Sequence, residues 1–471
     1  MTEPTWISVL PPLLAIGLAI VTRQVYLSLA SGVWLGWTIL VGGNPIAGLA
    51  RAIDETVRVL GDQDNARVIL FTLVIGALIA TVEAAGGVRG FVHWLERKNF
   101  VTNGKRAQLL AFIVGVVIFI ESNITVLVAG AIGRPLFDRF RVSREKLAYI
   151  IDSTSAPICI MIPLNAWGAY VLVLLGESAV DQPLSVFIAS IPLNFYAIAA
   201  VLVTLATVLF GVDLGPMKKA ERRTQGGELL SPKAAPLLDP EVLSPPPNDR
   251  IEPLARNMFL PIAAMVLMMP VALFITGDGD LRAGSGSTSV LWAVLTGLAV
   301  AWLLLLAQRA YTVDELTRTG LKGAGGLMSL ALVLLLALAL GSVARQLGTG
   351  LYIAQATGGL LPAAVFLPLV FLVGAGIGFS TGTSWGTFAI MIPIAVPAAE
   401  ALGMPAAPFV AAALSGGIFG DHASPISDTT IIASMAAATD HIDHVRTQLP
   451  YALISGGIAT AAFAIAGAFT G

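Results

Sequence analysis

Charge and cysteine are both scarce in this chain of 471 residues. Only 12% of the residues are charged, and Cys159 is the single cysteine. A soluble domain carries about 25% charged residues, so the composition excludes an ordinary soluble protein. One cysteine excludes an internal disulfide and a cysteine-based zinc site. The net charge of −2 gives no sign of nucleic-acid binding, and no nucleophile–base motif of an enzyme is present.

A basic segment is also missing before the first apolar stretch, where Glu3 is the only charged residue. A cleavable signal peptide begins with such a basic region, so none is expected here.

Long apolar stretches dominate what is present, with 56% hydrophobic residues and a mean hydropathy of +0.84. About 20 apolar residues cross a bilayer as a helix. Stretches that meet this criterion are 6–22, 25–43, 67–84, 187–212, 258–277, 288–307, 323–342 and 450–470. Two further crossings, 148–176 and 409–437, contain polar clusters. The sequence therefore predicts an all-α polytopic membrane protein with about ten transmembrane helices.

Two more apolar stretches, 108–133 and 355–400, are interrupted by polar residues and are predicted to be re-entrant hairpins. Basic residues flank the first on both sides, whereas no Lys or Arg occurs from 346 to 445. The positive-inside rule then makes the first enter from the cytoplasm and the second from outside. With the N-terminus outside, 22 of the 27 Lys and Arg residues are cytoplasmic.

The halves 1–212 and 258–471 show signs of an internal repeat. At a constant offset of 258, Trp34 matches Trp292 and Ser122 matches Ser380. Each half has five crossings, so the second is expected to be inverted, with broken helices meeting at the midplane, as in many secondary transporters. The polar stretch between them, 213–257, is expected to be a flexible cytoplasmic linker, with a regulatory segment as the alternative.

The two polar clusters inside apolar sequence carry carboxylates, Asp152 in one and Asp421 with Asp428 in the other. An ionised carboxylate in hydrocarbon is costly, so these residues are expected to face an interior path for an ion or substrate. Pro425 predicts a helix break between the last two. Carbonyls freed by a break, together with carboxylates and hydroxyls, are oxygen ligands that suit Na⁺.

The candidate ion- and substrate-binding residues are the oxygen-bearing side chains of the clusters and hairpin tips: Asp421, Asp428, Asp152, Glu121, Asn123, Thr125, Ser153, Thr381, Thr383, Ser384, Ser424, Ser427 and Thr429. Among them Asp421, Asp428 and Asp152 are the candidate Na⁺ ligands. A single Ser or Thr in a membrane helix more often bonds to nearby backbone than to an ion. His422 fits a proton relay and a structural role equally, whereas His441 and His444 are expected to be solvated loop residues.

Three segments resemble NhaC-type sodium/proton antiporters of the ion transporter superfamily. GGIFGDHASPISDTTIIAS, followed by DHIDHVRTQLPYAL, is similar to their C-terminal signature, and STGTSWGTFAIMIPIA resembles their second hairpin. RPLFDRFRVSREKLAYIIDSTSAPI resembles the first-half segment of the longer branch. The chain departs from these relatives at Glu121-Ser122-Asn123, where they often have an acidic pair, and at Ala423, where they often have cysteine.

The resemblance implies a multi-pass carrier of the bacterial inner membrane that works by alternating access, with Asp421, Asp428 and Asp152 at or beside the ion site. The function expected is Na⁺/H⁺ antiport, in which carboxylates bind either Na⁺ or H⁺. No cofactor is expected beyond these transported ions. The alternative is a carrier that couples Na⁺ or H⁺ to a small organic ion, such as a carboxylate or amino acid. A channel fits less well because channels are usually symmetric oligomers, and a homodimer stays open as the assembly.

Overall fold

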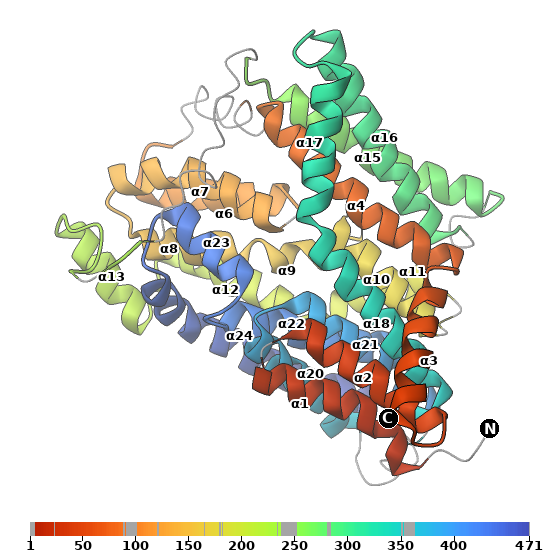
Figure 1. Ribbon diagram of the computed structural model, residues 1–471. Helices are drawn as coiled ribbons and strands as arrows, with labels where there is room; N and C mark the ends of the chain where they lie inside the picture. Colours follow the sequence, from red (N-terminus) through yellow and green to blue (C-terminus); the bar gives the residue numbers. More distant parts are fainter. Residues whose placement is uncertain are drawn as a thin grey trace.

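The chain is helical throughout the part that the structure describes, which confirms the predicted all-α class (Figure 1). The computed structural model describes residues 5–22, 24–87, 90, 101–119, 122–163, 165–178, 180, 182–232, 234–236, 252–279, 284–349, 352 and 363–470.

The first half contains η1 (Trp6–Val9), α1 (Leu10–Thr22), α2 (Val25–Leu40), α3 (Pro45–Val59), α4 (Gln63–Ala84), α6 (Gly104–Val117), α7 (Ser122–Arg139), α8 (Arg144–Ser153), α9 (Ala156–Cys159), α10 (Ala166–Glu177), α11 (Pro183–Ser190), η2 (Ile191–Leu193) and α12 (Phe195–Phe210). After α13 (Gly215–Gln225) come α15 (Arg256–Thr276), α16 (Gly286–Ala307), α17 (Val313–Gly326), α18 (Met328–Gln346), α20 (Ala363–Thr381), α21 (Ser384–Ala401), α22 (Ala406–Ala423), α23 (Asp428–Ala437) and α24 (His441–Thr470).

The described helices account for seven to nine membrane spans. Seven are long and apolar enough to cross alone, and nine result if the bent pairs α2–α3 and α17–α18 each count as one. Of the ten predicted crossings, α1 at 6–22 is too short to count, and 148–176 and 409–437 are each divided into separate helices. The count includes instead α20 and α21, which belong to the second predicted hairpin. Broken backbone at membrane depth is tolerated only where protein or a cavity surrounds it.

The first interrupted crossing divides into α8, the single turn α9, and α10. Pro157 lies in the first turn of α9, where a missing backbone donor is tolerated. Asn165 caps α10, because its side chain accepts a 3.0 Å hydrogen bond from Gly168 N. The N-terminus of α10 therefore begins inside the protein, with a buried capping amide.

The second interrupted crossing divides into α22 and α23. Pro425 lies in the break, and Ser427 caps α23 by accepting a 3.3 Å hydrogen bond from Thr430 N. The predicted effect of Pro425 agrees with this position, since proline cannot donate to a helix and disfavours its continuation.

Close glycine contacts hold α20 and α21 against the break after α22. The turn between α20 and α21 contains Gly382, whose φ is +68°. A Cβ on Gly420 would overlap the carbonyl oxygen of Ala375, and one on Gly378 would crowd the carbonyl of Gly417. Small residues let membrane helices approach closely, so these contacts place the α20–α21 turn beside Asp421.

The α6–α7 turn is only partly described. Thr125 Oγ1 donates a hydrogen bond to the carbonyl oxygen of Ile118 across it. Glu121 and the side chain of Asn123, both candidate site residues, lie outside the described part.

Helices of the two halves pack against each other across the interior. α10 packs on α21, and α23 packs on α7 and α8. Likewise α12 packs on α22, and α24 packs on α8. In Figure 1 α8, α12, α23 and α24 gather on one side of the molecule, away from α15 and α16. Both polar clusters therefore lie at an interface between the halves.

The first part of the segment 213–257 differs from the flexible linker that its composition predicts. Its helix α13 buries Met217 and Thr224. Glu221 Oε1 accepts a 2.6 Å hydrogen bond from Ser143 Oγ, and Lys146 pairs with Asp213 at 2.7 Å. These contacts dock α13 on the first turn of α8, while residues 237–251 lie outside the described part.

Candidate functional site

Asp152 lies at the C-terminal end of α8 and is 1% exposed. Its Oδ2 accepts hydrogen bonds from Gln448 Nε2 at 2.7 Å and from Thr430 Oγ1 at 3.0 Å. The Nε2 atoms of His422 and His444 each lie 4.0 Å from the same oxygen. Among the described residues no Lys or Arg pairs with Asp152, so the cationic partners within this distance are imidazoles, which are charged only when protonated.

His422 connects the two halves beside Asp152. Its Nε2 lies 3.1 Å from Ser153 Oγ and its Nδ1 lies 2.7 Å from the hydroxyl of Tyr196. The imidazole is 4% exposed, and its backbone carbonyl accepts a 2.7 Å hydrogen bond from Gln448. Since Ser153 and Tyr196 belong to the first half, the histidine is fixed between elements of both halves.

Asp421 lies in the last turn of α22, and its carboxylate contacts the N-terminus of α21. Its Oδ2 accepts hydrogen bonds from Ser384 Oγ at 2.6 Å and from Ser384 N at 3.2 Å. Unpaired backbone N–H groups at a helix N-terminus stabilise an anion, so α21 favours the ionised carboxylate. Ser384 Oγ also lies 3.3 Å from the carbonyl oxygen of Gly417, which brings three kinds of oxygen together near the C-terminus of α22.

The remaining hydroxyls that sequence reasoning selected are mostly bonded to nearby backbone. Thr381 Oγ1 donates to Ile377 O at 2.8 Å, and Ser424 Oγ donates to Phe379 O at 2.7 Å. The hydroxyls of Ser427 and Thr429 are 3.0 Å apart. Thr383 precedes α21 and caps it with no side-chain hydrogen bond. These contacts hold the helix breaks in shape, and the role of these hydroxyls as ligands stays a prediction.

The predicted set of three Na⁺ carboxylates, Asp421, Asp428 and Asp152, stays a prediction. The side chain of Asp428 lies outside the described part. No group of three His, Cys, Asp or Glu residues that could hold a metal ion occurs among the residues that are described. The structure does bring together oxygen atoms of Asp421, Ser384 and Gly417.

Several residues near Asp152 were not predicted from the sequence: Tyr196, Thr430, Ser434, His444 and Gln448. The expectation that His444 is solvated is wrong, because its side chain is fully buried. The spacing of His444 and Gln448 could have indicated this position, since residues four apart share one face of a helix. His444 Nε2 lies 2.9 Å from Gln448 Oε1.

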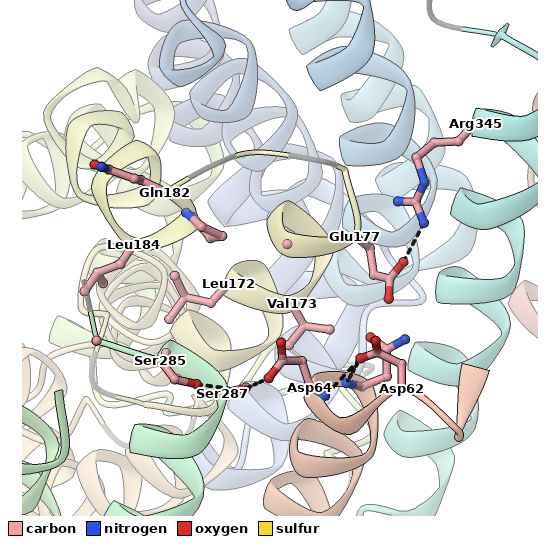
Figure 2. A pocket seen from close by; sticks show the side chains of 15 residues that line it. Asp62, Asp64, Leu172, Val173, Glu177, Gln182, Leu184, Ser285, Ser287 and Arg345 are labelled. Atoms are coloured by element: carbon pink, nitrogen blue, oxygen red, sulfur yellow. Dashed lines mark hydrogen bonds and ion pairs between the residues drawn. The ribbon is translucent and has the colours of Figure 1, made fainter. Parts of the chain in front are cut away.

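A separate cavity of about 690 Å³ opens between α4, α10, α11, α16 and α18 (Figure 2). Glu177 and Arg345 form an ion pair of 2.6 Å on one side of it. On the other side Asp64 accepts a 2.5 Å hydrogen bond from Ser287 Oγ. Asp62 also lines the cavity and caps α4 by accepting from Asp64 N at 2.9 Å. Both halves contribute to this acidic cavity.

Comparison with known proteins identifies the family. Residues 174–468 match the model of the Na⁺/H⁺ antiporter family. An uncharacterized protein of Haemophilus influenzae is 34% identical over 94% of this chain and 88% of its own length. The arginine/ornithine antiporter ArcD of Halobacterium salinarum is 31% identical over 44% of this chain and 41% of its own length.

The fold also matches a solved transporter. The YdaH transporter of Alcanivorax borkumensis, described as having an unusual topology, superposes with a TM-score of 0.59 at 14% identity. The match covers 90% of this chain and 89% of that one. The family expected from the sequence motifs is confirmed at this level, while membership of the NhaC branch stays a prediction. The chain belongs to the Na⁺/H⁺ antiporter family and is a multi-pass membrane protein that works as a secondary active antiporter, not as an enzyme.

Proposed function

We propose that this antiporter exchanges Na⁺ for H⁺, with the proton on Asp152 and the cation at Asp421. The observation that carries the proposal is the environment of Asp152, a buried carboxylate whose nearest cationic partners are two imidazoles at 4.0 Å. Burial without a fixed positive charge favours a carboxylate that changes its protonation state. Two imidazoles beside it supply nitrogen atoms that can accept and release a proton.

The surroundings of Asp421 fit a small cation instead. The carboxylate, the hydroxyl of Ser384 and the carbonyl of Gly417 are hard oxygen donors within one cluster. The C-terminal end of α22 adds carbonyl dipoles, which favour a cation. The predicted role of Asp428 as a further ligand remains part of this proposal.

Coupling follows from the short chain of contacts between the two carboxylates. His422 adjoins Asp421 in sequence, and its Nε2 lies 4.0 Å from Asp152. A cation at Asp421 and a proton on Asp152 both neutralise charge in one buried region. Because a cation at Asp421 removes negative charge that would favour a proton on Asp152, and the reverse, binding of one ion disfavours the other, which produces exchange.

Alternating access is proposed to use an inverted repeat. Supporting this are the reciprocal contacts between halves: α10 packs on α21, while α23 packs on α7. The predicted boundaries 1–212 and 258–471, the cytoplasmic linker, and the two hairpins belong to the same proposal. The excess of basic residues on one side supports insertion in a bacterial inner membrane with that side in the cytoplasm.

A second candidate function has one observation in its favour. The cavity of about 690 Å³ that Asp62, Asp64, Glu177 and Arg345 line is far larger than a sodium ion and presents both signs of charge. Such a cavity suits a small organic ion, and the relative ArcD is named as an arginine/ornithine antiporter. Exchange of an organic ion coupled to Na⁺ or H⁺ is therefore the alternative.

Purified protein in liposomes that contain a pH-sensitive dye tests the choice. Sodium, lithium and potassium are added separately, followed by arginine, ornithine, malate and lactate. Proton movement on addition of sodium alone supports Na⁺/H⁺ exchange. No proton movement with any of the three cations, but proton movement when an organic ion is present, contradicts Na⁺/H⁺ exchange and favours the alternative. Liposomes without protein measure the background leak.

A further inference from the structure

The buried carboxylate Asp152 is connected to the protein surface by three side chains in series. Ser434 Oγ lies 2.9 Å from His444 Nδ1 and 3.0 Å from His441 Nδ1. His444 is fully buried, whereas His441 is partly exposed and its Nε2 lies 2.7 Å from the carbonyl oxygen of Pro425. The series therefore runs from the surface to a point 4.0 Å from Asp152.

The acceptors around the two imidazoles fix which nitrogens carry hydrogen. The partner of His441 Nε2 is a carbonyl oxygen, so this nitrogen must donate. Gln448 directs its Nε2 at two acceptors, Asp152 Oδ2 and the carbonyl of His422, so its Oε1 faces His444. His444 Nε2 must then donate as well. Both imidazoles consequently carry a hydrogen on Nε2 and direct Nδ1 at Ser434.

One hydroxyl hydrogen cannot serve both Nδ1 atoms. Ser434 has a single hydrogen to donate, and the carbonyl of Thr430, at 2.8 Å, is a further acceptor for it. A neutral imidazole that is protonated on Nε2 has only an acceptor at Nδ1. The arrangement is satisfied only when at least one of the two Nδ1 atoms also carries a hydrogen, which makes that imidazole cationic. His441, Ser434 and His444 together therefore bind one proton more than two neutral imidazoles and a hydroxyl carry.

We propose that His441, Ser434 and His444 form a proton relay between the cytoplasmic surface and Asp152. The inference rests on the proposed role of Asp152 as the proton carrier. The charged or titratable groups that face the relay are Asp152 and Arg144 from α8, His422 from α22, and Asp440 just before α24. The anionic Asp152 is the nearest counter-charge for a proton on His444.

The transfer balances in hydrogen and charge. Cationic His441 gives its Nδ1 proton to Ser434 Oγ while the original hydroxyl proton of Ser434 passes to His444 Nδ1. His444 is then cationic, and it releases its Nε2 proton to Asp152 when Gln448 moves aside and the 4.0 Å gap closes. Neutral His441, neutral His444 and protonated Asp152 result. The same steps in reverse release a proton from Asp152 to the cytoplasm.

Two modes of sodium transport distinguish damage to the relay from damage to the cation site. Radiolabelled sodium exchange at equal pH on both sides needs no net proton transfer, whereas uptake driven by a pH gradient does. We expect His444→Gln and Ser434→Ala to slow the gradient-driven mode at least about tenfold relative to sodium–sodium exchange, because positioned proton transfer contributes about 100-fold or more. Ser434→Thr is the matched control, since it keeps the hydroxyl and is expected to keep the coupled rate.

Equal loss of both modes, or no loss of either, overturns the relay. A wild-type protein that moves no sodium in either mode defeats the proposed function instead. Nuclear magnetic resonance of protein with isotope-labelled histidine decides the relay even then, because the chain has only four histidines. The expected result is a hydrogen on Nδ1 of one of the two imidazoles, and Ser434→Ala is expected to remove the coupling between the Nδ1 signals of His441 and His444. Two neutral imidazoles at every pH from about 6 to 8 contradict the inference.

Discussion

The side chain of Gln448 donates a 2.7 Å hydrogen bond to Asp152, a residue 296 positions earlier in the chain. The same nitrogen donates to the carbonyl oxygen of His422 at 2.7 Å, and Oε1 lies 2.9 Å from His444. Gln448 thus joins α8, α22 and α24 at one buried point. Its amide fixes the distance between Asp152 and the histidines.

Replacing Gln448 with leucine is expected to lower the free energy of unfolding by about 1–3 kcal/mol, because buried acceptors lose their donor. Thermal unfolding in detergent measures the effect. Gln346→Leu, at an exposed position on α18, serves as the control and is expected to shift stability little. A Gln448→Leu protein as stable as the control would show that water or a neighbour replaces the lost amide.

Asp152→Asn and Asp421→Asn are each expected to abolish transport without preventing folding. Asparagine keeps the side-chain volume and an acceptor oxygen, so Thr430 and Ser384 retain a partner. What is lost is the negative charge that binds a proton or a cation. Asp314→Asn, at an exposed ion pair with Arg318, provides the control in the same liposome assay. Wild-type exchange by a well-folded Asp152 or Asp421 variant is the contradicting outcome.

Gly420→Ala is expected to destabilise the protein by about 1–3 kcal/mol, because a new methyl group would overlap the backbone of α20. Gly376→Ala is a matched control on α20, since a Cβ there meets nothing within 4 Å. Comparing the thermal unfolding of both variants isolates the helix contact from the loss of glycine itself. Equal melting temperatures would disprove close packing of α20 on α22.

The stability of the protein is expected to depend on pH through Glu145, in the first turn of α8. Burial raises the pKa of Glu145 above its ordinary value of 4.5, although the hydrogen bond from Arg223 opposes this shift. The folded protein therefore holds this proton more tightly than the unfolded chain. The resulting stabilisation is complete below pH 4.5 and is lost as the pH rises through the folded-state pKa.

Glu145→Gln should remove that loss, so its melting temperature relative to wild type is expected to increase as the pH rises. Thermal unfolding over a series of pH values in detergent measures this difference. Glu228→Gln, at an exposed position of the segment that follows α13, controls for the change of net charge. A difference that stays constant with pH would contradict the assignment.

The carboxylates of the site could be predicted from the sequence, because Asp152 and Asp421 are rare charges within apolar stretches. Ser153 and Ser384 could also be predicted, since one lies beside Asp152 and the other in a polar hairpin tip. Gln448 and Ser434 were not, because one uncharged polar side chain in an apolar helix has many ordinary explanations. Only the packing of α24 and α23 on α8 brings Gln448 to Asp152, and Ser434 to the neighbouring His444.

The class of fold followed from hydropathy alone, whereas the course of the segment after α12 did not. Its charges and prolines predict exposure to water, and exposure is usually accompanied by mobility. The apolar face of α13 is short, and its burial depends on partners such as Ser143 and Lys146 that lie far away in sequence. Such long-range pairing leaves no periodic signal.

The docking of α13 on α8 means that a label on α13 would report movement of α8. Its anchors, Glu221 to Ser143 and Arg223 to Glu145, are short and partly or fully buried, so α13 must travel with the helix that carries Asp152. The native Cys159 is buried and the chain has no second cysteine. A thiol-reactive fluorophore can therefore be attached at Lys218→Cys, an exposed position of α13. A change in its fluorescence during transport would report movement of α8, and the fluorophore would lie in solvent, away from the proposed ion site.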